Sequence, residues 1–253
     1  MKRLISLSLI CMLVLPMPIG LSGNTTTAPP AESLKEITFR GLPADASMSD
    51  VKEMLFSEGI KEEAITVEAT TRGYQLNCRS TEPIKLAGYS LYTFTVEFYY
   101  AVKDGAPDNS PEEAGLVSAK YEPNYDDQEL VFNALNKKLS SLYGAPIENR
   151  TVKSYINASF RLYKDTLTWK GANDSYITLR RQFNSYDGET MAGNSQSEGL
   201  WVEYFLSNYN EKTKKIDEIL EAMKEIEMQK AREAELQKIE EEIEEGTSDM
   251  TGL

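Results

Sequence analysis

Hydrophobic and polar residues alternate most regularly between Tyr92 and Val102. The apolar set on every second position is Tyr92, Phe94, Val96, Phe98, Tyr100 and Val102, and threonine or glutamate fills the first three positions between them. A period of two places successive side chains on opposite faces of a strand, so one face is buried and the other meets water. We therefore expect this stretch to be the central strand of an antiparallel sheet.

Shorter segments around this strand predict a first unit. Residues 65–67 and 74–78 alternate in the same way, and the Thr-Arg-Gly sequence at 71–73 predicts a hairpin turn between them. Residues 47–58 begin with serine caps and carry an apolar stripe at helical spacing, which predicts a helix. Residues 117–121 are expected to pair with the central strand, with their odd-numbered side chains inward.

A second helix is predicted farther along the chain. Apolar residues recur at helical spacing from Leu130 to Leu142, and Gly144 supplies a stop. Asp126 and Glu129 have the spacing of a capping box. Three or four strands should follow, at approximately 152–163, 166–170, 176–183 and 200–206. The polar insertion at 184–199 is expected to be mobile.

These elements predict an α+β fold. We expect one domain over 36–209, made of two helix-plus-antiparallel-sheet units at 36–122 and 123–209. A long charged helix is expected over 210–246 and a disordered end over 247–253. The helix carries Ile216, Ile219, Met223 and Ile226 at heptad-like spacing, and then the register breaks. A solvated helix on a monomer is therefore favoured over a dimeric coiled coil.

The first residues predict the compartment. Lys2 and Arg3 precede an apolar run to Leu15, and prolines and small residues follow. This pattern is typical of a secretory signal peptide at 1–23, followed by a Thr- and Pro-rich linker at 24–35. The sequence therefore predicts a secreted, periplasmic or cell-envelope protein. The alternative is an uncleaved membrane anchor, which is the one case in which we expect contact with a membrane.

The amino-acid composition excludes several kinds of reactive site and disfavours one class of partner. The chain of 253 residues has no histidine, which removes histidine-based triads, zinc sites and proton shuttles. A net charge of −13 disfavours nucleic acid as a partner. Once a signal peptide containing Cys11 leaves, Cys78 is the one remaining cysteine, and its place in an alternating strand favours a buried apolar role over a reactive thiol.

A set of short motifs makes this chain similar to known proteins. They are FRGLP at 39–43 with SMSDV at 47–51, the long aromatic strand, LYGAP at 142–146, LTWKG at 167–171 and ITL at 177–179. In this order the chain resembles exported bacterial proteins whose α/β layout is similar to BamE and to β-lactamase inhibitor protein. The resemblance implies an adaptor or inhibitor scaffold that binds another protein through a sheet face or loops. It carries no functional residue onto this chain, which has Ala44-Asp45 where a Trp-Gly pair is expected.

Three further motifs contain residues of the kinds that bind phosphate, bind calcium or catalyse hydrolysis. Gly41-Leu42-Pro43 lacks the other glycines and the lysine of a phosphate loop, so a turn is favoured. Four acids at 104–113 (Asp104, Asp108, Glu112 and Glu113) lack the spacing of a calcium loop, so a solvated hairpin is favoured. Asp126 and Asp127 are better explained by helix capping than by catalysis. We therefore predict no catalytic, metal or cofactor site.

The candidate partner contacts are aromatic. Tyr99 and Trp201 are the residues most expected to contact another protein, whereas Trp169 is expected to pack internally. Arg180 and Arg181 should point to opposite faces of the sheet. The predicted function is a non-catalytic exported binding or adaptor protein, which holds its partner through an exposed sheet face, the 184–199 loop or the C-terminal helix. The alternative is a hydrolase that uses paired carboxylates on an extracellular polymer or glycan.

Overall fold

The computed structural model describes residues 34–79, 84–124, 127–155, 161–186, 189–190 and 199–250. The chain divides into two units, 1–32 and 33–253, and every described residue belongs to the second. The predicted signal peptide and nearly all of the predicted linker lie outside the described residues.

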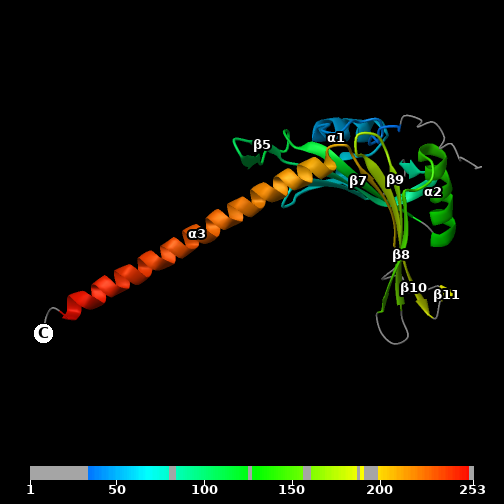
Figure 1. The fold of residues 1–253 in the computed structure, drawn as a ribbon. Helices are drawn as coiled ribbons and strands as arrows, with labels where there is room; N and C mark the ends of the chain where they lie inside the picture. Colours follow the sequence, from blue (N-terminus) through cyan, green and yellow to red (C-terminus); the bar gives the residue numbers. More distant parts are fainter. Residues whose placement is uncertain are drawn as a thin grey trace, which may run out of the picture. The chain divides into compact units, whose positions relative to one another are not determined.

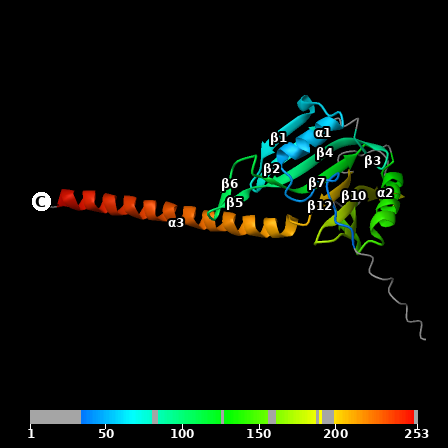
Figure 2. The same ribbon diagram turned by 90° about the horizontal axis from the view of Figure 1, so that it is seen from above.

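Within the described residues, ten strands join in one sheet (Figure 1; Figure 2). Its main path runs β1 (Ile65–Ala69), β2 (Gly73–Arg79), β4 (Tyr89–Tyr99), β7 (Gly115–Pro123), β12 (Gly199–Phe205), β10 (Tyr176–Tyr186), β9 (Arg161–Lys170) and β8 (Glu148–Tyr155). The short strands β3 (Lys85–Leu86) and β11 (Glu189–Thr190) pair with β4 and β10, and β5 (Ala101–Lys103) and β6 (Ala106–Asp108) form a separate hairpin. The helices are α1 (Met48–Ser57), α2 (Gln128–Tyr143) and α3 (Tyr209–Met250), with a short 3-10 turn at Glu62–Ala64.

The expectation of two separate helix-plus-sheet units, 36–122 and 123–209, is wrong. Strand β12 pairs with β7 from Val202 opposite Tyr121 to Phe205 opposite Ser118, so the strands of both halves belong to one antiparallel sheet. Two separate sheets would each expose another edge of unpaired N–H and C=O groups, and the β7–β12 pairing removes both edges. The described part of the chain is therefore dominated by a single large sheet, with three helices.

Helices α1 and α2 pack on the same face of this sheet. Ser47 and Asp50 cap α1 reciprocally, as the serine pattern predicted, and Asp127 caps α2 by accepting a hydrogen bond from the Leu130 amide at 3.0 Å. Asp126 lies outside the described residues. Apolar side chains of both helices share one core with the inward residues of β2, β4, β7, β9, β10 and β12. In Figure 1 the two helices lie on the outside of the bend in the sheet.

The loop at 40–43 is a tight turn, as predicted. Phe39 and Leu42 exchange two backbone hydrogen bonds of 3.0 and 2.8 Å. Arg40 and Gly41 between them both have positive φ, at 50° and 87°. This is the geometry of a two-residue hairpin turn, for which glycine is well suited.

The long aromatic strand is central, but its alternation is not continuous. Phe94, Val96 and Phe98 are buried in the main core, as expected, whereas Tyr92 is 68% exposed. The pairing of β4 with β7 shifts between Leu91 and Thr93 and again between Glu97 and Phe98. The extra residue is Tyr92 on β4 in the first irregularity and Val117 on β7 in the second, so each changes the phase of the side chains on its own strand, and Val117 faces away from the main core. The strand also ends at Tyr99, so Tyr100 and Val102 do not continue its inward face.

The C-terminal helix α3 is attached to the sheet only near its start. Ile216 is 1% exposed and packs with Tyr99 and Val117, on the sheet face opposite α1 and α2. Lys212 also pairs with Asp45. From Glu221 to Ile243 every described side chain is exposed. None of the helices in the described part of the chain is both long and apolar enough to cross a membrane.

Strand boundaries in the second half differ from the prediction. The single strand expected at 152–163 is two strands, because β8 ends at Tyr155, β9 begins at Arg161, and Ser154 pairs antiparallel with Leu162. In the predicted mobile insertion, β10 extends to Tyr186 and β11 follows at Glu189–Thr190. The remaining residues of 184–199, up to β12, lie outside the described residues.

Candidate binding site on the open face of the sheet

Away from the apolar contacts of α3, the face of the sheet opposite α1 and α2 carries mainly polar side chains. Strand register places Arg150, Thr166, Arg180 and Trp201 in one row across β8, β9, β10 and β12. These side chains alternate with core residues such as Leu167, so they point away from the two helices. Since neighbouring strands lie about 4.8 Å apart, the row spans roughly 14 Å between the backbones of Arg150 and Trp201.

The rows on either side differ in charge. One contains Lys164 opposite Gln182, and the other contains Glu148 and Glu203, with Lys120 beyond Glu203 on β7. Consecutive rows on one face lie two residues apart, or about 7 Å. Arg150, Arg180 and Lys164 therefore lie in two adjacent rows, and Glu148 and Glu203 lie in the third row, which ends at Lys120.

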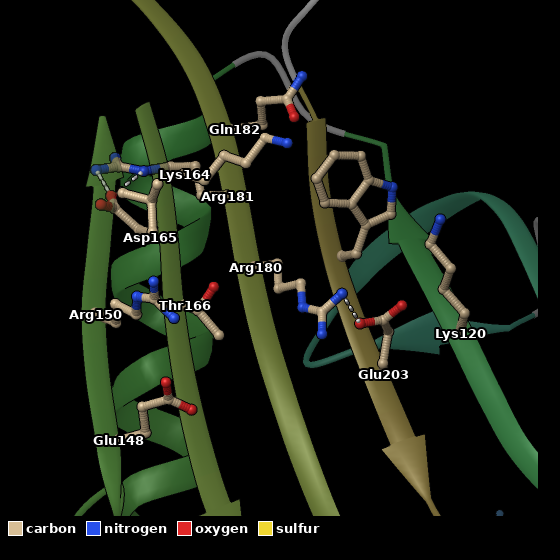
Figure 3. A pocket seen from close by; sticks show the side chains of 12 residues that line it. Lys120, Glu148, Arg150, Lys164, Asp165, Thr166, Arg180, Arg181, Gln182 and Glu203 are labelled. Carbon is tan, nitrogen blue, oxygen red and sulfur yellow. Dashed lines mark hydrogen bonds and ion pairs between the residues drawn. The ribbon is translucent and has the colours of Figure 1, made fainter. Parts of the chain in front are cut away.

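A hollow of about 520 Å³ lies over these rows (Figure 3). It is lined by Lys120, Glu148, Arg150, Val152, Lys164, Asp165, Thr166, Arg180, Arg181, Gln182, Trp201 and Glu203. A second hollow of about 340 Å³ is lined by Tyr92, Glu122, Pro123, Asn124, Gly199, Leu200 and Trp201. Trp201 therefore borders both hollows.

The indole of Trp201 is held in place by three neighbours. It donates its Nε1 hydrogen to Oε1 of Glu122 at 2.6 Å, and the ammonium of Lys120 lies 5.0 Å from the ring centroid. Gly199 leaves room for the ring, because a Cβ on that residue would lie 2.3 Å from Cζ2 of the indole. The ring is thus positioned before any ligand arrives.

Glu122 lies at the edge of this ring as a carboxylate at neutral pH. Burial works against its charged form, but hydrogen bonds from Thr93, Lys120 and Trp201 outweigh burial and lower the pKa of the carboxyl below its ordinary value. Thr93 donates at 2.8 Å and Lys120 lies at 3.1 Å. The charged acceptor strengthens the hydrogen bond that fixes Trp201.

The basic groups of the main hollow differ in how far they are engaged. Arg180 contacts Glu203 through Nη1 at 3.1 Å. Arg150 and Lys164 are exposed, and neither has an ion-pair or hydrogen-bond partner within the residues that the structure describes. Their charges are available to a ligand.

The carboxylates of the hollow already have partners. Glu148 accepts a hydrogen bond from the Thr168 hydroxyl at 3.2 Å, and Glu203 accepts one from the Thr178 hydroxyl at 3.1 Å and forms an ion pair with Arg180. Asp165 pairs with Arg181 at 2.7 Å. The hollow does not present a carboxylate in apolar surroundings, which is the environment that makes a general acid.

Arg180 and Arg181 point to opposite faces, as predicted. Arg180 joins the open polar face, whereas the guanidinium of Arg181 lies 4.8 Å from the ring of Phe132 on α2. Trp169 is fully buried and donates to the carbonyl of Gly144 at 3.1 Å, which confirms its internal packing role.

The two predicted partner contacts lie in different surroundings. Trp201 is half-buried at the centre of the open face, between the two hollows. Tyr99 is only 4% exposed and lies beneath α3, with its ring 6.1 Å from that of Tyr209. The structure therefore does not bring Tyr99 into the hollow.

Sequence reasoning missed Arg150, Lys164 and Glu122. Each is an ordinary charged residue of a strand, and its alternation shows only that it faces away from the core. The pairing of five strands, from β8 to β7, brings these residues onto one surface, and the sequence does not specify that pairing.

Other sequence candidates have structural roles. Cys78 is fully buried, and burial raises the pKa of its thiol to about 11, which confirms the apolar role. In the hairpin at 101–113, Lys103 pairs with Asp108 at 2.7 Å and with Glu113 at 3.7 Å. Within the described ranges, no three acidic or cysteine side chains are grouped to hold a metal ion.

Comparison with protein-family models, with curated proteins and with solved structures finds no match to this chain. The resemblance to BamE and β-lactamase inhibitor protein stays a prediction.

Proposed function

We propose that this chain is an exported, non-catalytic binding or adaptor protein that holds another protein on the open face of its sheet. The observation that carries the proposal is the half-buried Trp201, fixed on a polar sheet face between two hollows. A pre-positioned aromatic ring surrounded by polar groups is typical of the anchor residue of a protein interface.

Export is the second part of this proposal. It is supported by the basic start and apolar run of residues 1–23. The chain is proposed to act as a monomer, because the apolar spacing of α3 lacks a sustained heptad seam.

The three carboxylates that line the main hollow already have partners, and this supports binding over hydrolysis. A glycosidase needs one carboxyl group that holds its proton and a second one that is free to act as base or nucleophile. Here each carboxylate accepts a hydrogen bond from, or forms an ion pair with, a side chain of the same sheet.

Site-specific cross-linking tests the proposal. A photoreactive phenylalanine replaces Val152, which lines the hollow, and in a control protein it replaces Lys137, which is exposed on α2. The proposal expects a discrete cross-linked protein from the cell envelope or culture fluid at position 152 and none at 137. The product must also disappear when Trp201→Ala is added without a change in fold. Equal cross-linking at both positions, or none at either, would reject the proposal.

A further inference from the structure

The main hollow differs in charge from the chain that forms it. The whole chain carries −13, but four basic and two acidic side chains of the open face line the hollow, and the remaining charged pair of its lining, Arg181 and Asp165, is neutralised internally. Two of the basic groups, Arg150 and Lys164, have no partner within the described part of the chain. A local excess of positive charge on an acidic protein concentrates anions at that place and repels them elsewhere.

The basic groups are arranged for carboxylates. Arg150 and Arg180 lie in the same row, two strands or about 10 Å apart at the backbone, and Lys164 lies in the next row on the strand between them. The guanidinium fork matches a carboxylate in two parallel hydrogen bonds, and Arg180 uses one nitrogen on Glu203. Side chains on one side of an extended peptide repeat about every 7 Å, a spacing that these long basic side chains can meet.

The surroundings favour a short anionic segment over a continuous polyanion. Glu148 and Glu203 lie one row away from the basic groups, and the rest of the protein is acidic. A nucleic acid or an acidic polysaccharide carries its charge along its whole length and would meet this repulsion on leaving the hollow. An acidic stretch within an otherwise uncharged peptide would not.

Trp201 adds an apolar contact at one end of the row. Its ring is already fixed by Glu122, Lys120 and the space over Gly199, so little freedom is lost when a ligand side chain packs against it. The second hollow on its far side contains Tyr92, which is 68% exposed.

Building on the proposed function, we propose that the hollow binds an extended acidic segment of a polypeptide. Its carboxylates contact Arg150, Lys164 and Arg180, and an adjoining apolar side chain packs against Trp201.

The test uses a short tryptophan-free peptide that alternates glutamate and valine, with matched peptides that carry glutamine or lysine in place of glutamate. The protein has two tryptophans, and Trp169 is fully buried, so a change in intrinsic fluorescence on titration reports on Trp201. The acidic peptide is expected to change the emission, and the change should vanish in Trp201→Phe. Calorimetry on the same proteins supplies the affinity.

Paired variants locate the contact. Arg150→Gln with Lys164→Gln should weaken binding of the acidic peptide by roughly tenfold or more, because two charge-assisted contacts are lost. Lys137→Gln with Lys138→Gln removes the same charge from the exposed surface of α2 and should leave binding unchanged. Added salt should weaken binding to the unmodified protein.

Several results would overturn the inference. They are equal binding of the glutamine peptide, no loss in the Arg150 and Lys164 variant, or tighter binding of polygalacturonate or single-stranded DNA than of the acidic peptide. If the probes fail while the cross-link at Val152 persists, the ligand class is wrong and the binding function stands. If both fail, the proposed function is wrong as well.

Discussion

Arg72 and Asp217 form a bidentate ion pair, with Nε to Oδ1 at 2.7 Å and Nη2 to Oδ2 at 2.9 Å. The pair joins the turn between β1 and β2 to the start of α3, across a separation of 145 residues. The hydrogen bonds that Arg72 donates to the Asp217 carboxylate raise the pKa of Arg72. Both side chains remain partly exposed, at 40% and 45%, so water screens the interaction.

We predict that this pair orients α3 more than it stabilises the fold. A double-mutant cycle with Arg72→Ala and Asp217→Ala should give a coupling free energy of about 0.2–1 kcal/mol in urea unfolding. Higher salt should reduce the coupling. A coupling of several kcal/mol that salt does not change would contradict the exposed setting of the pair.

Ile216 should matter far more to stability than its neighbours along α3. Ile216→Ala removes a side chain packed between Tyr99 and Val117 and should lower the free energy of unfolding by about 2–4 kcal/mol. Ile226→Ala is the matched control, because Ile226 is 52% exposed and should cost well under 1 kcal/mol. Equal losses in thermal or urea unfolding would show that the exposed part of α3 is covered in solution.

Gly199→Ala should displace the indole of Trp201. The new Cβ would collide with the ring, so the hydrogen bond to Glu122 should be lost and the tryptophan emission should change. The same change in a Trp201→Phe background should cost less stability, because the smaller ring lacks the atoms that collide. Equal costs in both backgrounds would mean that the glycine serves another purpose.

Cys78 should be unreactive in the folded protein and should make stability depend on alkaline pH. Its folded pKa is raised to about 11 from an ordinary value of 9.0, so its contribution is complete below pH 9 and is lost as the pH rises to about 11. Urea unfolding from pH 8 to 11, compared with Cys78→Ala, isolates this part of the loss. Rapid labelling by a thiol reagent at pH 8 without denaturant would contradict the buried position.

Local structure was largely predictable from the sequence, because its causes are local. The serine cap of α1, the turn at Arg40-Gly41 and the end of α2 before Gly144 all depend on residues within a few positions of one another. The burial of Phe94, Val96 and Phe98 also followed from simple alternation.

The long-range pairing was not predictable in this way. The contact between β7 and β12 joins residues about 80 positions apart, and no local pattern distinguishes it from two separate sheets. The irregularity at Tyr92 moved that residue out of the expected phase, and β4 ends at Tyr99, before Tyr100. The candidate site depends on that pairing, so the sequence indicated Trp201 but not the basic residues beside it.

The attachment of α3 at one end has a mechanical consequence. At 1.5 Å per residue, the stretch from Glu221 to Met250 is about 45 Å long, and its tip lies about 50 Å beyond the contact at Asp217. A force applied at its tip therefore exerts a large torque on the few contacts at its base. We expect this torque to separate the helix from Tyr99 and Val117 before it strains the hydrogen-bonded strands beneath.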